Sequence, residues 1–424
     1  MKKVGVAILG FGTVGQGAYK ILLERKETIA KEYGVDISVK AVLVRNKEKA
    51  IAAGADESAL VTDIKDILDN ENISIVAECI GGVDPAKGYI LSSLKSGKSI
   101  VTANKELFAK NWIELEKVAS ENNVGLYYEA TTGGGIPIIR TMTEAMQAND
   151  IKEIKGIING TTNYILTRMT NEGADYADVL KDAQALGFAE ANPIADVEGY
   201  DASYKISILA TLAFNRVVPV ELIYREGISK IAKEDIEYGK RFGLTVKLLA
   251  IAKMKDDGKY EVRVHPAFIP SSHPLASVSG SFNAVFIVGD NVGDIMLYGR
   301  GAGSFPTGSA VVSDVVFAAR QIKHARYDGI EKAVTKEELI SDFESSYYLR
   351  LNVHDVAGVL AEITKLFAKY GVSIASMVQQ EGKDTVSIIF VTHATRENNM
   401  KKACEGIEKL TDVVKIANLI RIEK

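Results

Sequence analysis

The sequence has little cysteine, no basic block and no long apolar run. Its two cysteines, Cys79 and Cys404, match no zinc spacing and no disulfide framework, which fits a reducing compartment. Lysines and arginines are mixed with acids in a chain of formal net charge −4, so nothing favours nucleic acid as a partner. The five histidines show no metal-ligand spacing. No stretch reaches the ~18 apolar residues that span a bilayer, and we expect a cytoplasmic protein without a membrane partner.

The chain of 424 residues is long enough for two or three domains. In residues 1–130 apolar runs alternate with helical patterns, which predicts a doubly wound α/β domain with a parallel sheet. Residues 131–305 combine longer helices with alternating strands and predict an α+β substrate and dimerisation domain, while a helix at about 306–322 should return to complete the first domain. A charged stretch at 324–345 predicts a linker. Residues 346–424 then show the βαββαβ order of a ferredoxin-like domain.

The clearest cofactor signal is the glycine motif GFGTVG at residues 10–15, which follows a predicted strand and opens a predicted helix. Gly10 permits a tight turn, Gly12 lets the backbone approach a pyrophosphate, and Gly15 lets the helix pack closely on the strand. The helix N-terminus would face the phosphates with its unpaired N–H groups. This context predicts a Rossmann-type domain that binds a nicotinamide dinucleotide.

The end of the second predicted strand, VLVRN, bears on the choice of cofactor. Where an NAD enzyme commonly carries an acid that binds the ribose 2′-hydroxyl, this sequence has Arg45. A guanidinium can pair with a 2′-phosphate, so the sequence favours NADP and leaves NAD open. The predicted cofactor contacts are Gly10, Phe11, Gly12, Thr13, Val14, Gly15, Arg45, Ile80, Thr102, Lys105 and Gly303.

Three further segments lie at predicted strand ends, where such folds bind ligands. TANKE, residues 102–106, would bring Lys105 to the nicotinamide or to a substrate carboxylate. INGTTNYIL places Thr161 and Thr162 at a strand-to-helix junction suited to a carboxylate, with helix capping as the alternative. EATTGGGIP, residues 129–137, is a glycine-rich turn able either to bind an ion or simply to form a tight interdomain turn.

The segment richest in candidate chemistry is GFAEANPIADVEGYDASYK, residues 187–205. It carries acids at Glu190, Asp196, Glu198 and Asp201, followed by Lys205 on an expected helix. The i, i+4 spacing of Asp201 and Lys205 places them on one helix face, where the acid can orient the ammonium. Hydride transfer between an alcohol and an aldehyde needs a proton donor, which a desolvated lysine can supply. A solvated acidic loop with an ordinary surface ion pair is the alternative.

Together these segments resemble the homoserine dehydrogenase family, in its bacterial form with a C-terminal ACT domain. The motifs that carry the resemblance, in the family's order, are GFGTVG, TANKE, EATTGGGIPI, INGTTNYIL, LGFAEANPIADVEGYDASYK and GRGAGSFPT. The resemblance covers essentially all 424 residues. It implies NAD(P)-dependent interconversion of L-homoserine and L-aspartate 4-semialdehyde in threonine, methionine and isoleucine biosynthesis. It also implies feedback regulation by L-threonine through the ACT domain, and we expect a homodimer or homotetramer.

The resemblance further implies roles for single residues. Lys205 matches the proton donor and acceptor, Asp201 its orienting partner, and Lys105 a second active-site lysine. Two acids, Glu190 and Asp196, match those near the amino group of the substrate. The predicted substrate contacts are Thr161, Glu190, Asp196 and Asp201. A family sodium site made mainly of backbone carbonyls maps to Glu129, Thr132, Gly134 and Ile136.

Two other functions fit the same build. A nucleotide-sensing regulator would have a Rossmann domain and an effector domain but no chemistry, and it would be favoured by a missing lysine or acid in residues 190–205. None is missing. An oxidoreductase acting on another small amino acid or oxo acid is the other alternative, because the acidic segment, residues 187–205, does not specify the length of the substrate.

Overall fold

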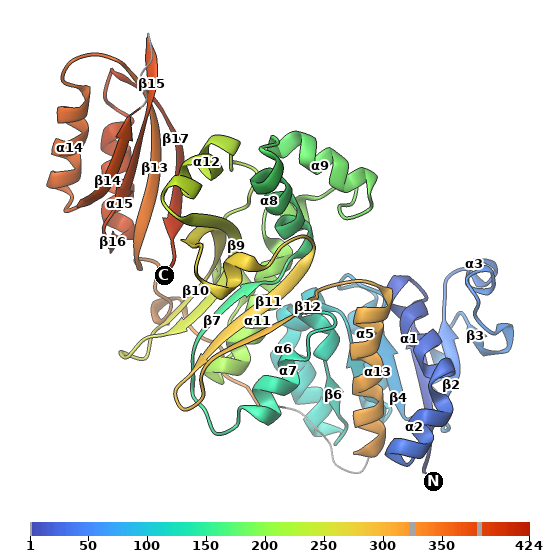
Figure 1. The fold of residues 1–424 in the computed structure, drawn as a ribbon. Coiled ribbons are helices and arrows are strands. Elements are labelled where there is room, and N and C mark those ends of the chain that lie inside the picture. The colour runs from blue at the N-terminus through green and yellow to red at the C-terminus, as the bar shows by residue number, and fades with distance from the viewer. Residues whose placement is uncertain (1, 322–327, 380–383) are drawn as a thin grey trace. The chain divides into compact units, whose positions relative to one another are not determined.

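The computed structural model describes residues 2–321, 328–379 and 384–424. The chain divides into two compact units, whose elements are labelled in Figure 1. Unit 1 comprises Met1–Gly160, Asp201–Ile223 and Phe282–Lys336, and unit 2 comprises Thr161–Tyr200, Tyr224–Ser281 and Glu337–Lys424. Within the described ranges no helix is long and apolar enough to cross a membrane. The first part of the predicted linker, residues 324–327, lies outside the described residues.

Unit 1 contains the parallel sheet that the alternating sequence pattern predicts. Its strand order is β3-β2-β1-β4-β5-β6, and every neighbouring pair is parallel. The strands are β1 (Lys2–Leu9), β2 (Val35–Leu43), β3 (Leu60–Val61), β4 (Ile75–Glu78), β5 (Ser99–Thr102) and β6 (Leu126–Tyr127). Because the chain proceeds outward from β1 on one side and from β4 on the other, a crevice opens at the carboxyl ends of these two central strands.

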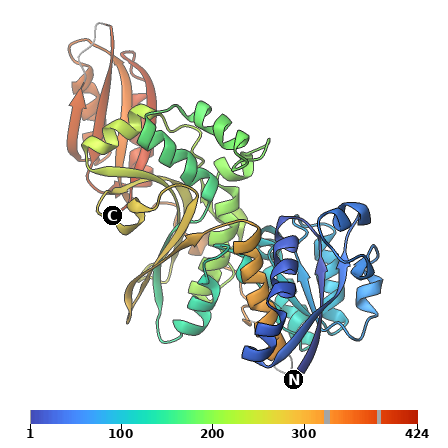
Figure 2. The same ribbon diagram turned by 45° about the vertical axis from the view of Figure 1, so that its right-hand side comes forward.

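Seven described helices flank this sheet, and part of them share one apolar core with it. They are α1 (Thr13–Glu24), α2 (Lys26–Tyr33), α3 (Lys47–Ala52), α4 (Lys65–Leu68), α5 (Ala86–Lys95), α6 (Lys105–Glu121) and α13 (Ser304–Arg320). Both Figure 1 and Figure 2 show α13 beside α1, although the two are far apart in sequence. Val311 and Val315 of α13 are fully buried with Val6 and Ile8 of β1 in this core.

The contact between α1 and α13 depends on glycine. An added Cβ at Gly17 would lie 2.1 Å from the carbonyl oxygen of Ser304, and one at Gly308 would lie 2.8 Å from the backbone nitrogen of Ala18. Real Cβ atoms do not approach backbone so closely, so only glycine permits this distance between the helices.

The remainder of unit 1 holds an antiparallel group and a buried helix. Strand β11 (Phe282–Gly289) pairs with β7 (Ile151–Ile157) on one side and with β12 (Gly293–Arg300) on the other, the latter as a hairpin. Helix α11 (Tyr200–Phe214) is buried along most of its length. The short α7 (Ile138–Arg140) follows the glycine-rich turn.

Unit 2 is built on one continuous sheet flanked by helices. Its strands run in the order β9-β10-β17-β13-β15-β14. They are β9 (Leu244–Met254), β10 (Tyr260–Pro270), β13 (Glu344–His354), β14 (Ile374–Gln379), β15 (Thr385–Thr392) and β17 (Val413–Ile422), with β8 (Tyr224–Arg225) beside β10. The helices are α8 (Gly160–Glu172), α9 (Tyr176–Ala185), α10 (Ile194–Val197), α12 (Lys233–Arg241), α14 (Val359–Lys369) and α15 (Glu397–Ile407).

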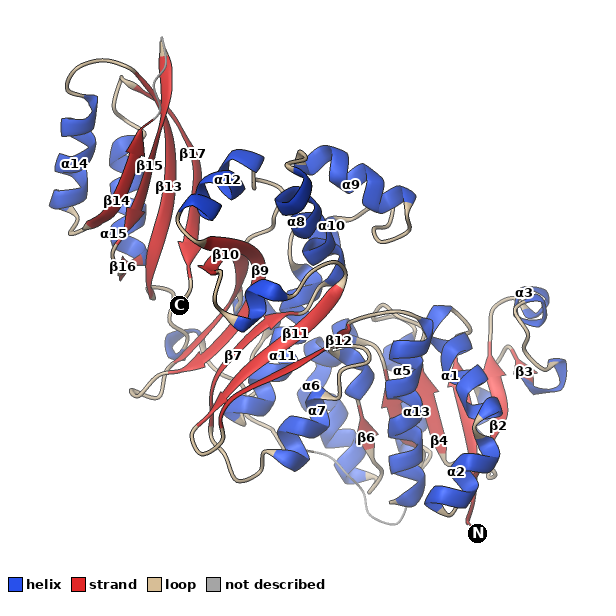
Figure 3. Ribbon diagram, viewed as in Figure 1, coloured by secondary structure: helices blue, strands red, loops and turns tan. Residues whose placement is uncertain are grey.

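The C-terminal part of unit 2 has the predicted ferredoxin-like order. Its elements follow as β13, α14, β14, β15, α15 and β17, with the two-residue β16 (Thr395–Arg396) added before α15. Helices α14 and α15 contact each other and share one core with the sheet (Figure 3). The last strand, β17, pairs with β13 on one side and in parallel with β10 on the other. This small domain therefore continues a sheet that begins outside it.

The glycine contact between α1 and α13 yields a prediction about stability. Gly308→Ala should lower the free energy of unfolding of unit 1 by about 1–3 kcal/mol, because the new methyl group must push the helices apart. Gly88→Ala is the matched control: Gly88 also lies in a helix, but no described atom beyond its own neighbourhood lies within 4 Å of an added Cβ. The control should gain about 0.5–1 kcal/mol from helix propensity. Urea denaturation measures both, and equal changes would contradict the packing argument.

Candidate active site

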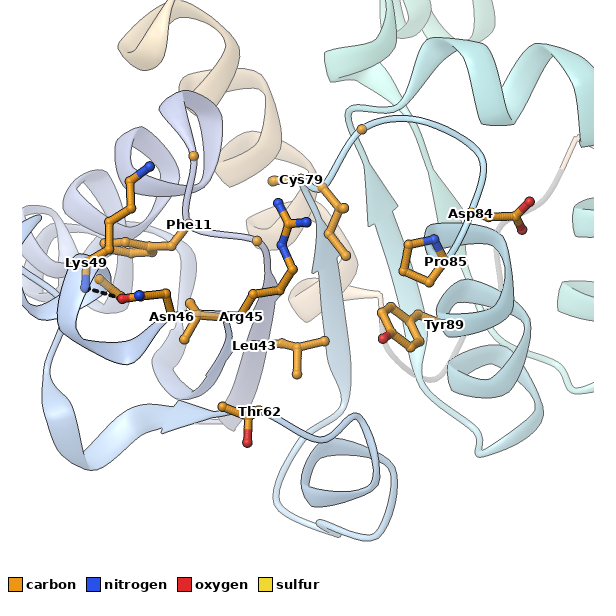
Figure 4. Close-up of a pocket in the computed structure, with 16 residues that line it drawn as sticks. Phe11, Leu43, Arg45, Asn46, Lys49, Thr62, Cys79, Asp84, Pro85 and Tyr89 are labelled. Atoms are coloured by element: carbon orange, nitrogen blue, oxygen red, sulfur yellow. Dashed lines mark hydrogen bonds between the residues drawn. The ribbon is translucent and has the colours of Figure 1, made fainter.

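A cleft of unit 1 lies at the carboxyl ends of β1, β2 and β4 and has a volume of about 510 Å³. Figure 4 shows the side chains that surround it. Five of the predicted cofactor residues line it, namely Gly10, Phe11, Gly12, Arg45 and Ile80. The cleft coincides with the crevice expected of this strand order, so the fold and the glycine motif point to the same place.

The glycine loop has the geometry that a dinucleotide requires. Gly10 has φ +92° and donates its N–H to the carbonyl of Leu43 at 3.0 Å, which makes the turn. An added Cβ at Gly15 would lie 2.2 Å from the carbonyl oxygen of Gly10, so helix and loop are in close contact. At Gly12 no described atom beyond its chain neighbours lies within 4 Å of such a Cβ, and no side chain caps α1 there. The helix start is thus open to an anionic ligand.

Positive charge lines the same cleft at the end of β2. Figure 4 shows the exposed Arg45 side chain projecting from this strand end toward Cys79. Asn46 caps α3 by accepting the N–H of Lys49 at 2.6 Å, and Lys49 also lines the cleft. A guanidinium and an ammonium therefore both line the part of the cleft where the ribose of a dinucleotide would lie.

A buried acid, which the sequence interpretation missed, binds the backbone of the loop that follows β4. Glu78 ends β4, is fully buried, and accepts the N–H of Ile80 at 2.7 Å and the hydroxyl of Thr102 at 2.6 Å. Burial raises the pKa of Glu78, while these hydrogen bonds act to lower it. Thr102 also accepts the N–H of Asn104, which caps α6 directly before Lys105. The available signal was a single acid within the otherwise apolar run ISIVAECI.

The residues with the strongest case for chemistry are two lysines that share one carboxylate. Lys205 Nζ lies 2.7 Å from Asp201 Oδ2 within α11, and Lys105 Nζ lies 3.0 Å from Asp201 Oδ1. Lys205 also donates to the carbonyl of Ile158 at 2.8 Å, and Asn159 donates to Asp201 Oδ2 at 2.8 Å. Burial alone would raise the pKa of Asp201, but the charges of Lys205 and Lys105 hold it well below its usual range. The pair predicted from i, i+4 spacing thus lies buried, and Lys105 joins it from α6.

In unit 2 the predicted substrate residues are only partly brought together. The hydroxyl of Thr161, at the start of α8, lies 2.8 Å from the carbonyl of Phe188 and 3.1 Å from Asp196 Oδ2. Thr161 therefore contacts the acidic segment. Glu190 is exposed, and its backbone carbonyl accepts the side-chain amide of Gln184 at 3.1 Å.

The glycine-rich turn of residues 129–136 has oxygen atoms suited to a cation. Gly133 and Gly134 adopt positive φ values of 76° and 53°, and an added Cβ at Gly134 would lie 2.5 Å from the carbonyl oxygen of Gly301. The hydroxyl of Thr132 is buried without a hydrogen-bond partner among the described atoms. The carboxylate of Glu129 accepts the N–H groups of Ile139 and Arg140 in α7, and its backbone carbonyl accepts the N–H of Thr132 at 3.4 Å. Backbone carbonyls and hydroxyls are ligands of hard cations, and the sodium site at this turn stays a prediction.

The other predicted cofactor residues lie around the cleft and do not line its described wall. Thr13 and Val14 begin α1, and the carbonyl of Thr13 accepts the hydroxyl of Ser304 at 2.8 Å. Thr102 is buried beneath the loop that Glu78 holds. Gly303, with φ +122°, precedes α13. Among the described residues no group of three or more His, Cys, Asp or Glu side chains is placed to hold a metal ion.

A parallel sheet with an open glycine loop at its switch point, and a lysine–carboxylate pair in the same unit, is the arrangement of an oxidoreductase that uses a nicotinamide cofactor. Three family models match the chain: "Homoserine dehydrogenase, NAD binding domain" at residues 10–129, "Homoserine dehydrogenase" at 137–316 and "ACT domain" at 347–410. The chain belongs to the homoserine dehydrogenase family.

Individual relatives agree with the family models. The chain is 40% identical to the homoserine dehydrogenase of Bacillus subtilis (strain 168), over 100% of this chain and 99% of that one. A crystal structure of a homoserine dehydrogenase from Thiobacillus denitrificans matches with a TM-score of 0.92 and 40% identity, over 100% of this chain and 99% of that one. A hyperthermophilic archaeal homoserine dehydrogenase in complex with NADPH matches with a TM-score of 0.63 and 28% identity, over 74% of this chain and 97% of that one.

The environment of Glu129 predicts a pH dependence of stability. Burial, followed by the charge of Asp314, raises the pKa of Glu129 from 4.5 to about 7. A carboxyl whose pKa is raised by folding stabilises the protein fully below pH 4.5 and loses that contribution as the pH rises through 7, a change of about 3 kcal/mol. Glu129→Gln should remove this slope, even if it lowers stability uniformly through a lost hydrogen bond. Unfolding measured from pH 4.5 to 8 tests the difference in slope, and parallel curves would contradict it.

Proposed function

We propose that this protein interconverts L-homoserine and L-aspartate 4-semialdehyde, with NADP preferred over NAD and Lys205 transferring the proton. The observation that carries the proposal is the buried Asp201 carboxylate held between Lys205 and Lys105 in the unit that contains the cofactor cleft. The names of the relatives support the substrate, and the archaeal NADPH complex supports the class of cofactor.

The hydrogen bonds of Lys205 account for its role. An ammonium has three N–H donors, and in the described structure two of them point to Asp201 Oδ2 and to the carbonyl of Ile158. The third is left for a substrate oxygen. In the direction of reduction Lys205 gives this proton to the oxygen that becomes the hydroxyl, and in the direction of oxidation the neutral amine takes it back. The bound cofactor supplies or accepts the hydride at C4 of the substrate.

Asp201 and Lys105 prepare this transfer. Because the pKa of Asp201 stays low, its carboxylate remains charged and orients Lys205 throughout the reaction. Lys105, bound to the other oxygen and with a side chain 40% exposed, is placed to contact the substrate. Glu190 and Asp196 remain our predicted ligands of the substrate amino group, with Thr161 beside Asp196.

Three further assignments stay predictions, and the first two of them come from the sequence resemblance. A sodium ion would bind to the carbonyls of Glu129, Thr132, Gly134 and Ile136, and the positive φ values in that turn support this. L-threonine would act through the ACT domain, which the family model at residues 347–410 supports as the seat of regulation. A homodimer or homotetramer in the cytoplasm is the expected form.

The experiment that tests the function is an assay of L-homoserine oxidation with NADP and with NAD, with and without L-threonine. Lys205→Met should lower kcat by roughly 10³-fold, because general acid–base catalysis contributes factors of about this size, and should leave the Kd for NADPH unchanged. Lys98→Met is the control. Lys98, directly before β5, is also buried, and its ammonium donates to the carbonyls of Asn70 and Ile73. The control should unfold more easily and keep its turnover.

The outcomes of that assay separate the alternatives. Turnover by Lys205→Met within tenfold of the parent protein would remove the proposed proton role. If the folded parent protein turned over homoserine with neither cofactor, a nucleotide-sensing regulator or an oxidoreductase for another small amino acid or oxo acid would be favoured.

The preference for NADP has its own test. Arg45→Asp should raise the KM for NADP by roughly 10- to 100-fold, since a charge-assisted hydrogen bond to the 2′-phosphate is replaced by repulsion, and should leave the KM for NAD equal or lower. Lys31→Asp, at an exposed position of α2, makes the same change of charge outside the residues that line the cleft. If both variants lost NADP equally, general electrostatics would explain the preference and Arg45 would not.

A further inference from the structure

The C-terminal ACT domain is joined to the rest of unit 2 through its last strand. β17 pairs in parallel with β10 at Ala267–Arg421 and Phe268–Ile422, and the N–H of Glu423 donates to the carbonyl of Phe268 at 2.8 Å. This pairing fixes Arg421 beside β8, the short strand that pairs with the same β10. The last ACT strand and β8 thus both pair with β10.

Arg421 links two carboxylates from different parts of unit 2. Its side chain is 2% exposed and donates to Glu397, at the start of α15, at 3.0 Å from Nε and 2.6 Å from Nη2. It also donates to Glu226, just after β8, at 2.8 Å from Nη1 and 3.2 Å from Nη2, and to the hydroxyl of Tyr224 at 2.8 Å. A guanidinium with two carboxylates in this geometry holds both acids in fixed positions.

The residue next to Glu226 contacts the end of the acidic segment. Arg225 Nη1 donates to the carbonyl of Glu198 at 3.0 Å, and its guanidinium lies 3.2 Å from the ring centroid of Tyr200. The N–H of Ile228 donates to the carbonyl of Val197 at 2.8 Å. Residues 224–228 thus lie between the ACT arginine and residues 197–200, which lead directly into the helix that carries Asp201 and Lys205.

Residues 197–200 and residues 224–228 are in close contact, in part through their backbones. An added Cβ at Gly227 would lie 2.4 Å from Glu198 Oε2 and 2.5 Å from the carbonyl oxygen of Val197. At Gly199, which has φ +77°, it would lie 3.3 Å from Cγ of Arg225. Because protein interiors are close-packed, a shift of residues 224–228 would press on residues 197–200.

We propose that Arg421 is a positioning residue for the acidic segment, and that through Glu226 and Arg225 it couples the ACT domain to the residues that bind substrate. The inference rests on the proposed role of residues 190–201 in substrate binding. It names a specific route by which a change in the ACT domain reaches the reaction, and it assigns a role to an arginine that does not itself touch the substrate.

The test uses the full-length protein and three variants along the route: Arg421→Met, Glu226→Ala and Arg225→Met. Each should raise the KM for homoserine by roughly 5- to 10-fold with a smaller change in kcat, the size expected for the loss of a charge-assisted hydrogen bond, and should leave the KM for the cofactor unchanged. The Glu226→Ala, Arg225→Met double variant should be no worse than the more affected single variant, because both changes interrupt one route. Glu226, 40% exposed, can be replaced without leaving Glu397 unpaired if Arg421→Met fails to fold.

Arg350→Met is the matched control. Arg350 is also a buried arginine on an ACT strand, but it pairs with Asp235 of α12 at 2.6 Å. It should lower thermal stability and leave the KM for homoserine unchanged. An equal rise in KM for Arg350→Met, or an unchanged KM for both Glu226→Ala and Arg225→Met, would overturn the proposal.

A second measurement does not depend on turnover. Hydrogen exchange of the peptide covering residues 187–200 should be faster in Glu226→Ala and Arg225→Met than in the parent protein and in Arg350→Met. If the parent protein lacked activity on homoserine while this pattern held, the proposed substrate would be wrong and the coupling right. If exchange were unchanged in the two route variants, the coupling itself would be wrong.

Discussion

The proposed reaction centre depends on the two ion pairs of the Asp201 carboxylate. This carboxylate joins two helices, since Lys205 lies on α11 and Lys105 on α6, and it separates two ammonium groups that would otherwise repel each other. It is buried yet remains ionised, because the two lysines and Asn159 compensate for lost hydration. The surrounding structure serves to hold this anion: Glu78 fixes Thr102 and Asn104, and Asn104 fixes the start of α6. The carbonyl of Ile158 sets the direction of Lys205.

Close contact between backbone segments is the second constraint on the structure. It occurs at three places where glycine lies against another segment. Glycine permits contact between α1 and α13, between the cofactor loop and its own helix, and between residues 197–200 and 224–228. In each case the missing side chain allows one backbone to lie directly on another, so the relative placement of the two segments is set by hard contact. Unit 1 thereby obtains a rigid cofactor loop. Unit 2 obtains a stiff connection from its C-terminal sheet to the acidic segment.

Much of the fold and of the candidate site could be predicted from local sequence patterns. Contacts between segments that are far apart in the sequence could not. The glycine motif and the strand alternation predicted the parallel sheet, and the βαββαβ order predicted the C-terminal fold, because both are written in short periodic patterns. The Asp201–Lys205 pair followed from i, i+4 spacing, but the arrival of Lys105 at the same carboxylate depends on how α6 packs on α11. Glu78 was missed because an acid in an apolar strand does not reveal which amides it will bind. Arg421 was missed because its partners, Glu226 and Glu397, come from segments that only the tertiary fold brings together.

The place of α13 in the first core also has a consequence for how the chain is made. The buried side chains of β1 and α1 are covered by a helix that spans Ser304–Arg320, so the ribosome must add several hundred further residues before that cover exists. At synthesis rates of about 5–20 residues per second the delay is roughly 15–60 seconds. During this time the apolar face that α13 covers in the folded protein lacks its cover. Folding of the nucleotide-binding domain is therefore completed late in synthesis, although its first strand is made at the start.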